Sequence, residues 1–175
     1  MYEFLDFHAS DVMSEPVSVG PDATLADAER ILEERGFNGL PVVADGALVG
    51  FVTSLDLLEA FAFSTDSILP PYDEIMRRPV STVMAREPAT VQLRTPLTRV
   101  LQKMVETRNK SFPVVDADDR LVGVVAREDV IRALRRAQAG ERPGPRSSEG
   151  TARKAQADRD PLEAFAAGTS EEPIR

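Results

Sequence analysis

Apolar and polar positions follow one pattern along this chain, and that pattern occurs twice. Each occurrence begins with apolar residues at helical spacing and continues with two short apolar runs separated by a polar turn. It closes with a second helical pattern. The first helical spacing covers residues 25–32, and its counterpart covers residues 97–105. The pattern therefore predicts two units of similar fold within one chain.

The two occurrences share residues as well as a pattern. VMSEPVSV aligns with VMAREPATV, LPVV with FPVV, and LVGFV with LVGVV, with only two one-residue gaps. Self-similarity of this kind indicates a duplication. The predicted organisation is an N-terminal segment at residues 1–10, a unit at 11–61, a linker at 62–81, a second unit at 82–137 and a tail at 138–175.

Capping residues predict where the first helix of each unit begins. In the first unit, Asp22 or Thr24 can cap a helix that Gly36 ends. In the second unit, Thr95 is the expected cap, and Pro96 stands at the first helical position, where its missing N–H costs nothing. The expected buried stripes are Leu25, Ala28, Ile31 and Leu32 in the first unit and Leu97, Val100, Leu101, Met104 and Val105 in the second.

A hairpin and a closing helix are predicted next in each unit. The polar turns ADGA and DADDR separate short apolar runs, which is typical of strands joined by Asp/Gly turn chemistry. Closing helices are expected to start near Ser54 and Arg127. Their expected inward residues are Leu57, Leu58 and Phe61 in the first unit and Val130, Ile131 and Leu134 in the second. The predicted fold class is α+β, with two β-α-β-β-α units packed sheet to sheet because neither unit buries enough surface alone.

The segments outside the two units differ in composition. The linker holds three prolines, which allow a short helix at most. Residues 138–175 are rich in Pro, Gly, Ser and mixed charge, which predicts a disordered tail. Within the tail, LEAFA at residues 162–166 repeats LEAFA at residues 58–62, either by coincidence or as a mimic of the first closing helix.

Composition and charge narrow the classes of function. The 175 residues include no cysteine, which excludes disulfides, thiolate catalysis and cysteine metal sites. A formal net charge of −8 disfavours nucleic acid and anionic membranes as partners. The N-terminus does not resemble a secretory signal, and the apolar runs are too short to span a membrane, so a cytoplasmic location is expected.

One motif stands at the start of each closing helix: GFVTSLD at residues 50–56 and GVVARED at residues 123–129. A threonine and an aspartate three residues apart can form a capping box. The same pair can instead bind a ligand, because a carboxylate accepts from a diol and helix-start amides attract an anion. Ala126 cannot cap, yet Asp129 is retained. This favours a separate task for the aspartate, although an acid in the first turn also stabilises a helix.

These motifs, in this order and twice over, resemble the tandem CBS domain, or Bateman module. The resemblance covers residues 11–134. It implies a pseudo-symmetric pair, a homodimer of pairs, and clefts between the units that hold adenosine-type ligands such as AMP, ADP, ATP or S-adenosylmethionine. In such modules the aspartate accepts both ribose hydroxyls and the threonine contacts ribose or phosphate.

The resemblance also implies a set of ligand-binding residues, with no catalytic or metal-binding residue. In the first unit they are Val17, Val19, Phe37, Asn38, Gly39, Thr53 and Asp56. In the second unit they are Ala89, Val91, Asn109, Lys110, Arg127 and Asp129. Phe37 could equally be a core aromatic residue, and Arg127 and Lys110 could be solvated surface charge.

Charge predicts that the two clefts differ. Residues 11–61 hold ten acidic and two basic residues, whereas residues 82–134 hold seven acidic and nine basic residues. The second cleft, with Arg127 and Lys110, should therefore prefer the more highly phosphorylated ligand. The first should prefer AMP or a less charged adenosyl compound.

The expected function is a regulatory module that binds an adenosyl compound and signals to a separate protein of unknown identity. The alternative is a ligand-free dimerisation or interaction scaffold that acts through its tail. An enzyme is disfavoured because the sequence has no P-loop, no G-x-G-x-x-G and no paired zinc ligands, and its one histidine, His8, lies outside the repeats.

Overall fold

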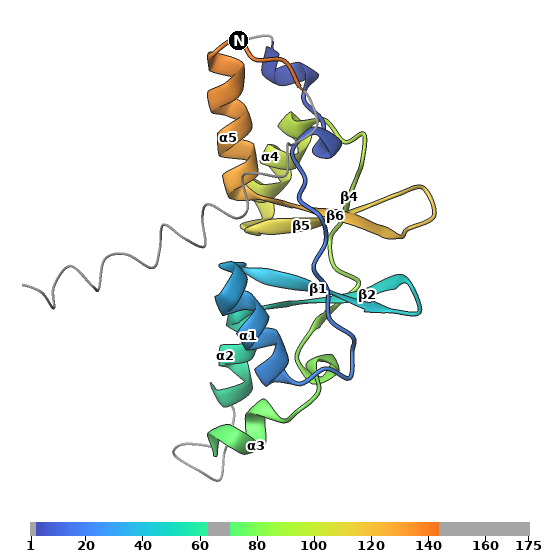
Figure 1. Cartoon of the computed structure of the whole chain (residues 1–175), viewed down its shortest axis with the longest axis vertical. Coiled ribbons are helices and arrows are strands. Elements are labelled where there is room, and N and C mark those ends of the chain that lie inside the picture. Colours follow the sequence, from blue (N-terminus) through green and yellow to red (C-terminus); the bar gives the residue numbers. More distant parts are fainter. Residues whose placement is uncertain (1–2, 63–70, 144–175) are drawn as a thin grey trace, which may run out of the picture.

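The computed structural model describes residues 3–62 and 71–143 and arranges them as two sheets with helices on their outer sides (Figure 1). The first unit contains α1 (Leu25–Arg35), β1 (Gly39–Ala44), β2 (Ala47–Thr53) and α2 (Ser54–Ala62). The second contains α4 (Leu97–Thr107), β5 (Ser111–Val115), β6 (Leu121–Ala126) and α5 (Arg127–Gln138). The predicted class, with two similar α+β units packed sheet to sheet, is confirmed. The predicted tail lies outside the described residues from residue 144 onward.

The first strand of each repeat is short. In the second unit, β4 (Val91–Gln92) pairs with β5 in parallel. In the first unit the equivalent is a single parallel bridge between Val19 and Val42. The Val19 N–H donates to the Pro41 carbonyl at 3.1 Å, and the Val43 N–H donates to the Val19 carbonyl at 2.9 Å. The predicted strand order is therefore present in both units.

Each sheet also receives backbone from the other repeat. The strand β3 (Ala85–Arg86) begins the second repeat but pairs with β2 in the first sheet. Reciprocally, Ser14 in the first repeat exchanges two backbone hydrogen bonds with Val124 of β6, at 2.9 and 3.1 Å. In Figure 1 the blue N-terminal segment descends from the upper sheet to the lower, and the green segment returns. The two repeats are therefore interlocked, which the sequence did not predict.

The hydrophobic cores follow the same exchange. The core under the second sheet includes Phe7, which comes from the N-terminal segment. The core under the first sheet includes Ile75 and Val80, which come from the linker and its short helix α3 (Tyr72–Met76). Segments that the sequence places outside the repeats thus contribute core residues. The N-terminal segment contributes to the core of the second unit, and the linker contributes to the core of the first unit.

The glycine of each LVG motif makes room for this exchange. A Cβ added at Gly50 would come within 2.5 Å of the Met84 Sδ, and one added at Gly123 would come within 2.6 Å of the Met13 Sδ. Both methionines belong to the exchanged segments. Repetition of the VM and LVG motifs therefore reflects one contact, made twice, in which a methionine of one repeat packs on a glycine of the other.

Capping explains the limits of α1. The Asp27 N–H donates to the Thr24 Oγ1 at 3.1 Å, and the Thr24 N–H donates to the Asp27 carboxylate at 3.2 Å, which together form a capping box. Gly36, at a φ of 63°, ends the helix in the left-handed conformation. Of the two predicted caps in this unit, Thr24 is the one used.

The prediction that Thr95 caps α4 is wrong. Its Oγ1 accepts from the Gln92 N–H at 2.9 Å, and the helix begins at Leu97 after Pro96. Thr95 lies one residue before the capping position, so its hydroxyl closes the turn after β4 instead of reaching the helix amides.

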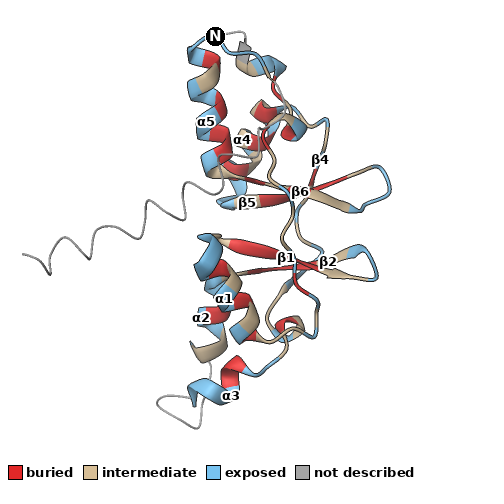
Figure 2. Cartoon of the chain, in the orientation of Figure 1, coloured by how far each residue is buried: buried red, intermediate tan, exposed pale blue. Residues whose placement is uncertain are grey.

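Figure 2 shows exposed as well as buried residues on the helices α2 and α5. Four residues predicted to face the core lie on the surface instead. Val105 on α4 is 70% exposed and Leu58 on α2 is 66% exposed, and Ile131 and Leu134 on α5 are exposed as well. Each of these helices packs against the core with one face only. The packed face is narrower than the stripe of apolar residues in the helix sequence, so the outer residues of the stripe stay exposed. None of the described helices has both the length and the apolar character needed to cross a bilayer.

Replacing Phe7 by alanine should destabilise the protein, although Phe7 lies outside the predicted repeats. Its side chain is fully buried in the second core, and removing a buried phenylalanine costs about 3–5 kcal/mol of unfolding free energy. Urea denaturation measures the loss. Leu5→Ala, at an exposed position of the same segment, is the matched control and should change stability by less than about 0.5 kcal/mol. Equal effects of the two variants would contradict the exchange.

The hydrogen bonds from Thr24 should make stability depend on pH. The side-chain hydrogen bond from the Thr24 Oγ1, at 2.7 Å, and then the Thr24 N–H lower the pKa of Asp27 from its ordinary value of 3.8. A lowered pKa stabilises the fold above the unfolded-state pKa, and this stabilisation is lost as pH falls through the folded-state pKa.

Thr24→Val should therefore raise the Asp27 pKa, as measured by NMR titration of the carboxyl. It should also destabilise the protein more at about pH 7 than at acid pH, because the stabilisation from the lowered pKa is lost as pH falls through the folded-state pKa. An unchanged Asp27 pKa in this variant would show that the capping box does not set it.

Candidate functional site

Thr53 and Asp56 form a capping box at the start of α2. The Thr53 Oγ1 and N–H both donate to the Asp56 Oδ2, at 2.7 and 2.6 Å, and the Asp56 N–H donates to the Thr53 Oγ1 at 3.3 Å. Within the described part of the chain, all hydrogen bonds of this carboxylate go to Oδ2. The half-buried side chain therefore keeps Oδ1 as an acceptor while Oδ2 holds the helix start.

Asp129 performs the same capping task without a hydroxyl beside it. Its Oδ2 accepts from the Ala126 N–H at 2.9 Å, and its Oδ1 lies 3.5 Å from the Arg132 Nη1. Its side chain is only 7% exposed. Retention of this aspartate next to Ala126 thus has a structural cause, and it does not by itself point to a ligand.

The hairpin brings the predicted polar positions of the first unit together. Gly39 pairs with Thr53 where β1 begins and β2 ends. The Asn38 carbonyl accepts from the Ser54 N–H at 3.4 Å. Asn38, Gly39, Thr53 and Asp56 therefore meet at one edge of the first sheet, next to the first turn of α2.

The predicted apolar positions of the first unit belong to its core or lie against it. Val19 is buried in that core beside β1. Val17 and Phe37 are partly buried and pack against the core from its margin. The core alternative for Phe37 thus agrees with its packing, and part of its surface and of the surface of Val17 stays accessible.

In the second unit the predicted positions are divided between core and surface. Val91, in β4, is buried in the second core, whereas Ala89, Asn109 and Lys110 are exposed. The Lys110 carbonyl accepts from the Arg127 N–H at 2.9 Å, the counterpart of the contact at Asn38. The backbone of the two edges is therefore alike, while their side chains differ in charge and burial.

Arg127 turns its guanidinium toward the end of α4. Its Nη2 donates to the Arg108 carbonyl at 2.6 Å, and its Nε donates to the Asn109 carbonyl at 3.2 Å. Arg108, at a φ of 60°, has the left-handed conformation that Gly36 has in the first repeat. A phosphate at this edge would have to compete for Arg127 with carbonyls that otherwise end a helix without partners.

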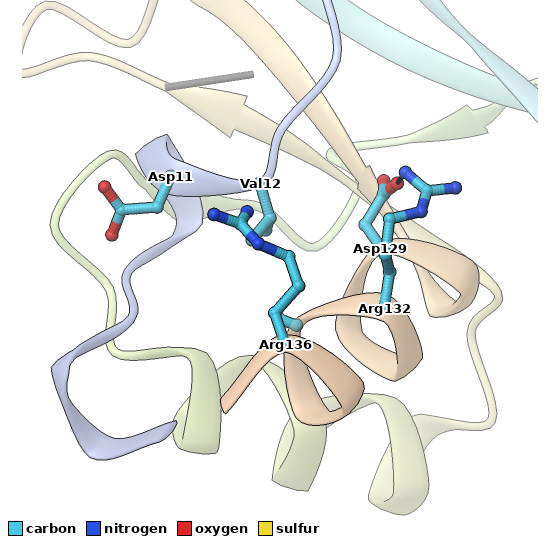
Figure 3. A pocket seen from close by; sticks show the side chains of 6 residues that line it. Asp11, Val12, Asp129, Arg132 and Arg136 are labelled. Carbon is cyan, nitrogen blue, oxygen red and sulfur yellow. Dashed lines mark hydrogen bonds and ion pairs between the residues drawn. The ribbon is translucent and has the colours of Figure 1, made fainter. Parts of the chain in front are cut away.

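A hollow beside Asp129 was not predicted (Figure 3). It lies between α5 and the N-terminal segment and is lined by Asp11, Val12, Asp129, Arg132, Ala133 and Arg136. The charges around it are paired: Asp11 accepts from the His8 N–H at 2.7 Å, and the Arg136 Nε donates to Glu141 at 2.9 Å. The spacing of Arg132 and Arg136, four residues apart on one helix, was the only signal for it in the sequence.

The exchange of segments changes the charge of each half. Residues 15–62 and 71–86, which form the first half, hold eleven acidic and five basic residues. Residues 3–14 and 87–143, which form the second, hold eleven of each. The first half is therefore acidic, as predicted for the first repeat, but the second is balanced and not basic.

Sequence comparison finds one family twice in the chain. The family model described as CBS domain matches residues 9–63 and 80–136. The chloroplastic CBS domain-containing protein CBSX2 of Arabidopsis thaliana is 31% identical over 135 residues, which cover 66% of this chain and 57% of that protein. L-aspartate semialdehyde sulfurtransferase of Methanocaldococcus jannaschii is 34% identical over 124 residues, which cover 70% of this chain and 22% of that enzyme. The chain thus spans just over half of one relative and about a fifth of the other.

Solved structures of this family have the same fold. The structure of CBSX2 in complex with AMP has a TM-score of 0.65 at 29% identity, covering 75% of this chain and 98% of that one. The CBS domain pair of protein MJ0100, in complex with 5′-methylthioadenosine and S-adenosyl-L-methionine, has a TM-score of 0.61 at 28% identity. That comparison covers 73% of this chain and 95% of the MJ0100 chain.

Exchanging the residues at the two capping positions should change stability in opposite directions. Thr53→Ala removes the hydroxyl that accepts from the Asp56 N–H, at a cost of about 1 kcal/mol of unfolding free energy. Ala126→Thr adds the equivalent hydroxyl at α5 and should stabilise by a similar amount. Urea denaturation of both variants is the measurement. Destabilisation by Ala126→Thr would show that the start of α5 does not accept the geometry found at α2.

Proposed function

Because the chain belongs to the CBS domain family, we propose that it is a regulatory module that binds an adenine nucleotide or another adenosyl compound between its two units. The observation that carries this proposal is the edge where Asn38 and Gly39 meet Thr53 and Asp56, with one carboxylate oxygen still available. Binding changes the relative stability of the module's conformations and so signals to a separate protein.

Asp56 is proposed to bind the ribose. A carboxylate has about four acceptor positions, so capping through Oδ2 leaves Oδ1 for the two ribose hydroxyls. Hydrogen bonds to an ionised acceptor are the stronger kind. Because Thr53 already fixes the carboxylate, little orientational freedom is lost when the ligand arrives.

The remainder of the first site is proposed to hold the base. Val17 and Phe37 offer accessible apolar surface beside the buried Val19, and the half-buried Asn38 offers a side-chain amide at the same edge, next to the buried Gly39. An apolar surface with a few fixed polar groups suits an aromatic base. Thr53 is proposed to contact the ribose or a phosphate.

A second, weaker site is proposed at the equivalent edge of the second unit. Its residues are Ala89, Val91, Asn109, Lys110, Arg127 and Asp129. Burial of Asp129 and its contact with Arg132 reduce what this carboxylate can offer to a ribose. Arg127 would reach a phosphate only after it releases the end of α4.

The relatives narrow the proposed ligand to compounds that contain adenosine. CBSX2 is described in complex with AMP, and the MJ0100 pair with 5′-methylthioadenosine and S-adenosyl-L-methionine. These ligands differ in charge but share the adenine and the ribose diol. Since the first half is acidic, we propose that AMP or S-adenosylmethionine binds there more tightly than ADP or ATP.

We propose that the chain is not itself an enzyme. Enzymes among its relatives are matched over a small part of their length, 22% in the case of the sulfurtransferase. The proposed role therefore needs a separate protein target, and the family resemblance adds a homodimer to the proposal. A cytoplasmic location is proposed from the sequence alone. Exposed Leu55 and Leu58 on α2 also fit the alternative, a dimerisation scaffold that binds no ligand.

Replacing Asp56 by asparagine should lower the affinity for AMP at least tenfold, about 1.4 kcal/mol, because a neutral amide replaces the charged acceptor. Isothermal titration calorimetry measures the change. Asp27→Asn is the matched control, since Asp27 forms the same capping box at α1 away from the proposed site. It should lower stability and leave AMP affinity unchanged.

Two results would decide against the proposal. Equal loss of affinity in Asp27→Asn and Asp56→Asn would assign the effect to helix stability. The second is an unchanged melting temperature of the wild-type chain with AMP, ATP and S-adenosylmethionine, since ligand binding to the folded state must raise it. That second result would favour the scaffold.

A further inference from the structure

The first helices of the two repeats end in different ways. In α1, the Gly36 N–H donates to the Glu33 carbonyl at 3.2 Å, and the Phe37 N–H donates to the Leu32 carbonyl at 2.9 Å. Gly36 has a left-handed conformation, which a glycine adopts without steric cost. The end of α1 is therefore closed by hydrogen bonds of its own backbone.

Side chains take a larger part at the end of α4. Arg108 has the left-handed conformation, at a φ of 60°, although its Cβ makes this conformation unfavourable. The Asn109 N–H donates to the Thr107 hydroxyl at 3.4 Å, and that hydroxyl donates to the Lys103 carbonyl at 2.7 Å. The conformation in which α4 ends therefore needs support from outside the backbone of the helix.

Arg127, the first residue of α5, gives this support. Its Nη2 donates to the Arg108 carbonyl at 2.6 Å, its Nε to the Asn109 carbonyl at 3.2 Å and its backbone N–H to the Lys110 carbonyl at 2.9 Å. One residue thus holds three successive carbonyls between α4 and β5. In the first repeat the first residue of α2 is Ser54, which has no guanidinium to hold the corresponding turn.

A lysine holds the middle of α4 independently of Arg127. The Lys103 Nζ donates to the Thr90 carbonyl at 2.8 Å and lies 5.5 Å from the centre of the Phe112 ring. Both contacts are made to the second unit's own strands and their approach, away from the end of the helix. If Arg127 released its carbonyls, the change in α4 would therefore be confined to the residues after Lys103.

Positive charge at this turn favours the approach of an anion. Arg108 and Lys110 are exposed, and Arg127 is half-buried. None of the ion pairs found in residues 3–62 and 71–143 includes these three side chains. The carbonyls that Arg127 holds are neutral, whereas a phosphate offers opposite charge and bidentate geometry, which give stronger bonds. Because the turn is exposed, water can hydrate the carbonyls that Arg127 releases.

We propose that Arg127 is a latch on the end of α4 that a phosphate group opens. The latch consists of the two hydrogen bonds from its guanidinium to the carbonyls of Arg108 and Asn109. A phosphorylated ligand at the second site draws the guanidinium away, and the last turn of α4 loosens. A ligand without phosphate leaves the latch closed. The latch rests on the proposed function, because the phosphate belongs to a ligand of the second site, and it adds a response that the first unit lacks.

Amide hydrogen exchange, followed by NMR on the full chain, measures the latch without ligand. Arg127→Ser introduces the serine of the first repeat and should accelerate exchange at Glu106 and Thr107 about fivefold or more. Exchange at Leu101, earlier in α4, should stay within about twofold of the wild-type rate. Arg135→Ser, at an exposed arginine of the same helix, is the matched control and should leave all three rates unchanged. Acceleration at Leu101 as large as at Thr107, or the same result in Arg135→Ser, would overturn the proposal.

A second substitution separates capping of α4 from general support of the fold. Adding Arg108→Gly to Arg127→Ser places a glycine where Gly36 ends α1, so the backbone can close the helix end without the latch. Exchange at Thr107 should then return to within about twofold of the wild-type rate. Thermal unfolding confirms that both variants fold. Exchange that stays fast in the double variant would show that Arg127 does not act by ending α4.

Sodium tripolyphosphate tests the response to phosphate without adenosine. In the wild-type chain it should accelerate exchange at Glu106 and Thr107, and sodium chloride at equal ionic strength should not. In Arg127→Ser, which has no latch, tripolyphosphate should cause no further change. Unchanged exchange in the wild-type chain would overturn the proposal.

ATP and adenosine separate failure of the latch from failure of the proposed function. Calorimetry measures whether each compound binds, and exchange at Thr107 in the same samples measures the latch. Both should bind, and only ATP should accelerate exchange. If both bind and neither changes the exchange, the latch is overturned and the proposed function stands. If neither binds while tripolyphosphate accelerates exchange, the proposed function fails and the latch stands as a response to free phosphate anions.

Discussion

Each sheet of this protein is completed by backbone that belongs to the other repeat. Strand β3 pairs with β2, and Ser14 pairs with Val124, so each half borrows an edge from the sequence of its neighbour. The two borrowed methionines then pack on Gly50 and Gly123. Neither sheet nor core is whole without the exchange, so the distance between the halves is set by the chain itself. A ligand between the units would therefore bind to two surfaces whose relative position is already fixed by the exchanged segments.

The proposed site combines structural and binding chemistry in one carboxylate. Capping orients Asp56 through one oxygen, and the other oxygen is the one that a ribose would use. The equivalent Asp129 is buried against Arg132 and serves the fold more than a ligand. The two copies of the motif thus differ through their surroundings. In both copies the aspartate caps the closing helix, and the neighbouring residues determine whether its second carboxylate oxygen is available to a ligand.

Local signals in the sequence were sufficient for much of this architecture. Helix spacing, the Thr24 cap and the hairpin turns act over a few residues, so element order and the meeting of Gly39 with Thr53 could be predicted. The exchange could not, because pairing between distant segments of two or three residues leaves no periodic pattern. Helical periodicity identifies which residues form an apolar stripe but not which of them another element covers. For this reason the periodicity predicts buried positions for Leu58 and Ile131, which are exposed. The sequence likewise suggests Arg127 as a phosphate ligand, because no local signal shows that its guanidinium donates to the carbonyls of Arg108 and Asn109 at the end of α4.

The interlocked halves have a consequence for how such a chain arises. A lone repeat could obtain its missing strand and its share of core only from another molecule, by swapping segments with it. Gene duplication and fusion then turn a swapped pair of identical molecules into one polypeptide, with the crossing segments kept as connections. After fusion the two copies are free to differ, and Thr53 in one repeat against Ala126 in the other is an asymmetry that a symmetric dimer of identical single repeats does not have.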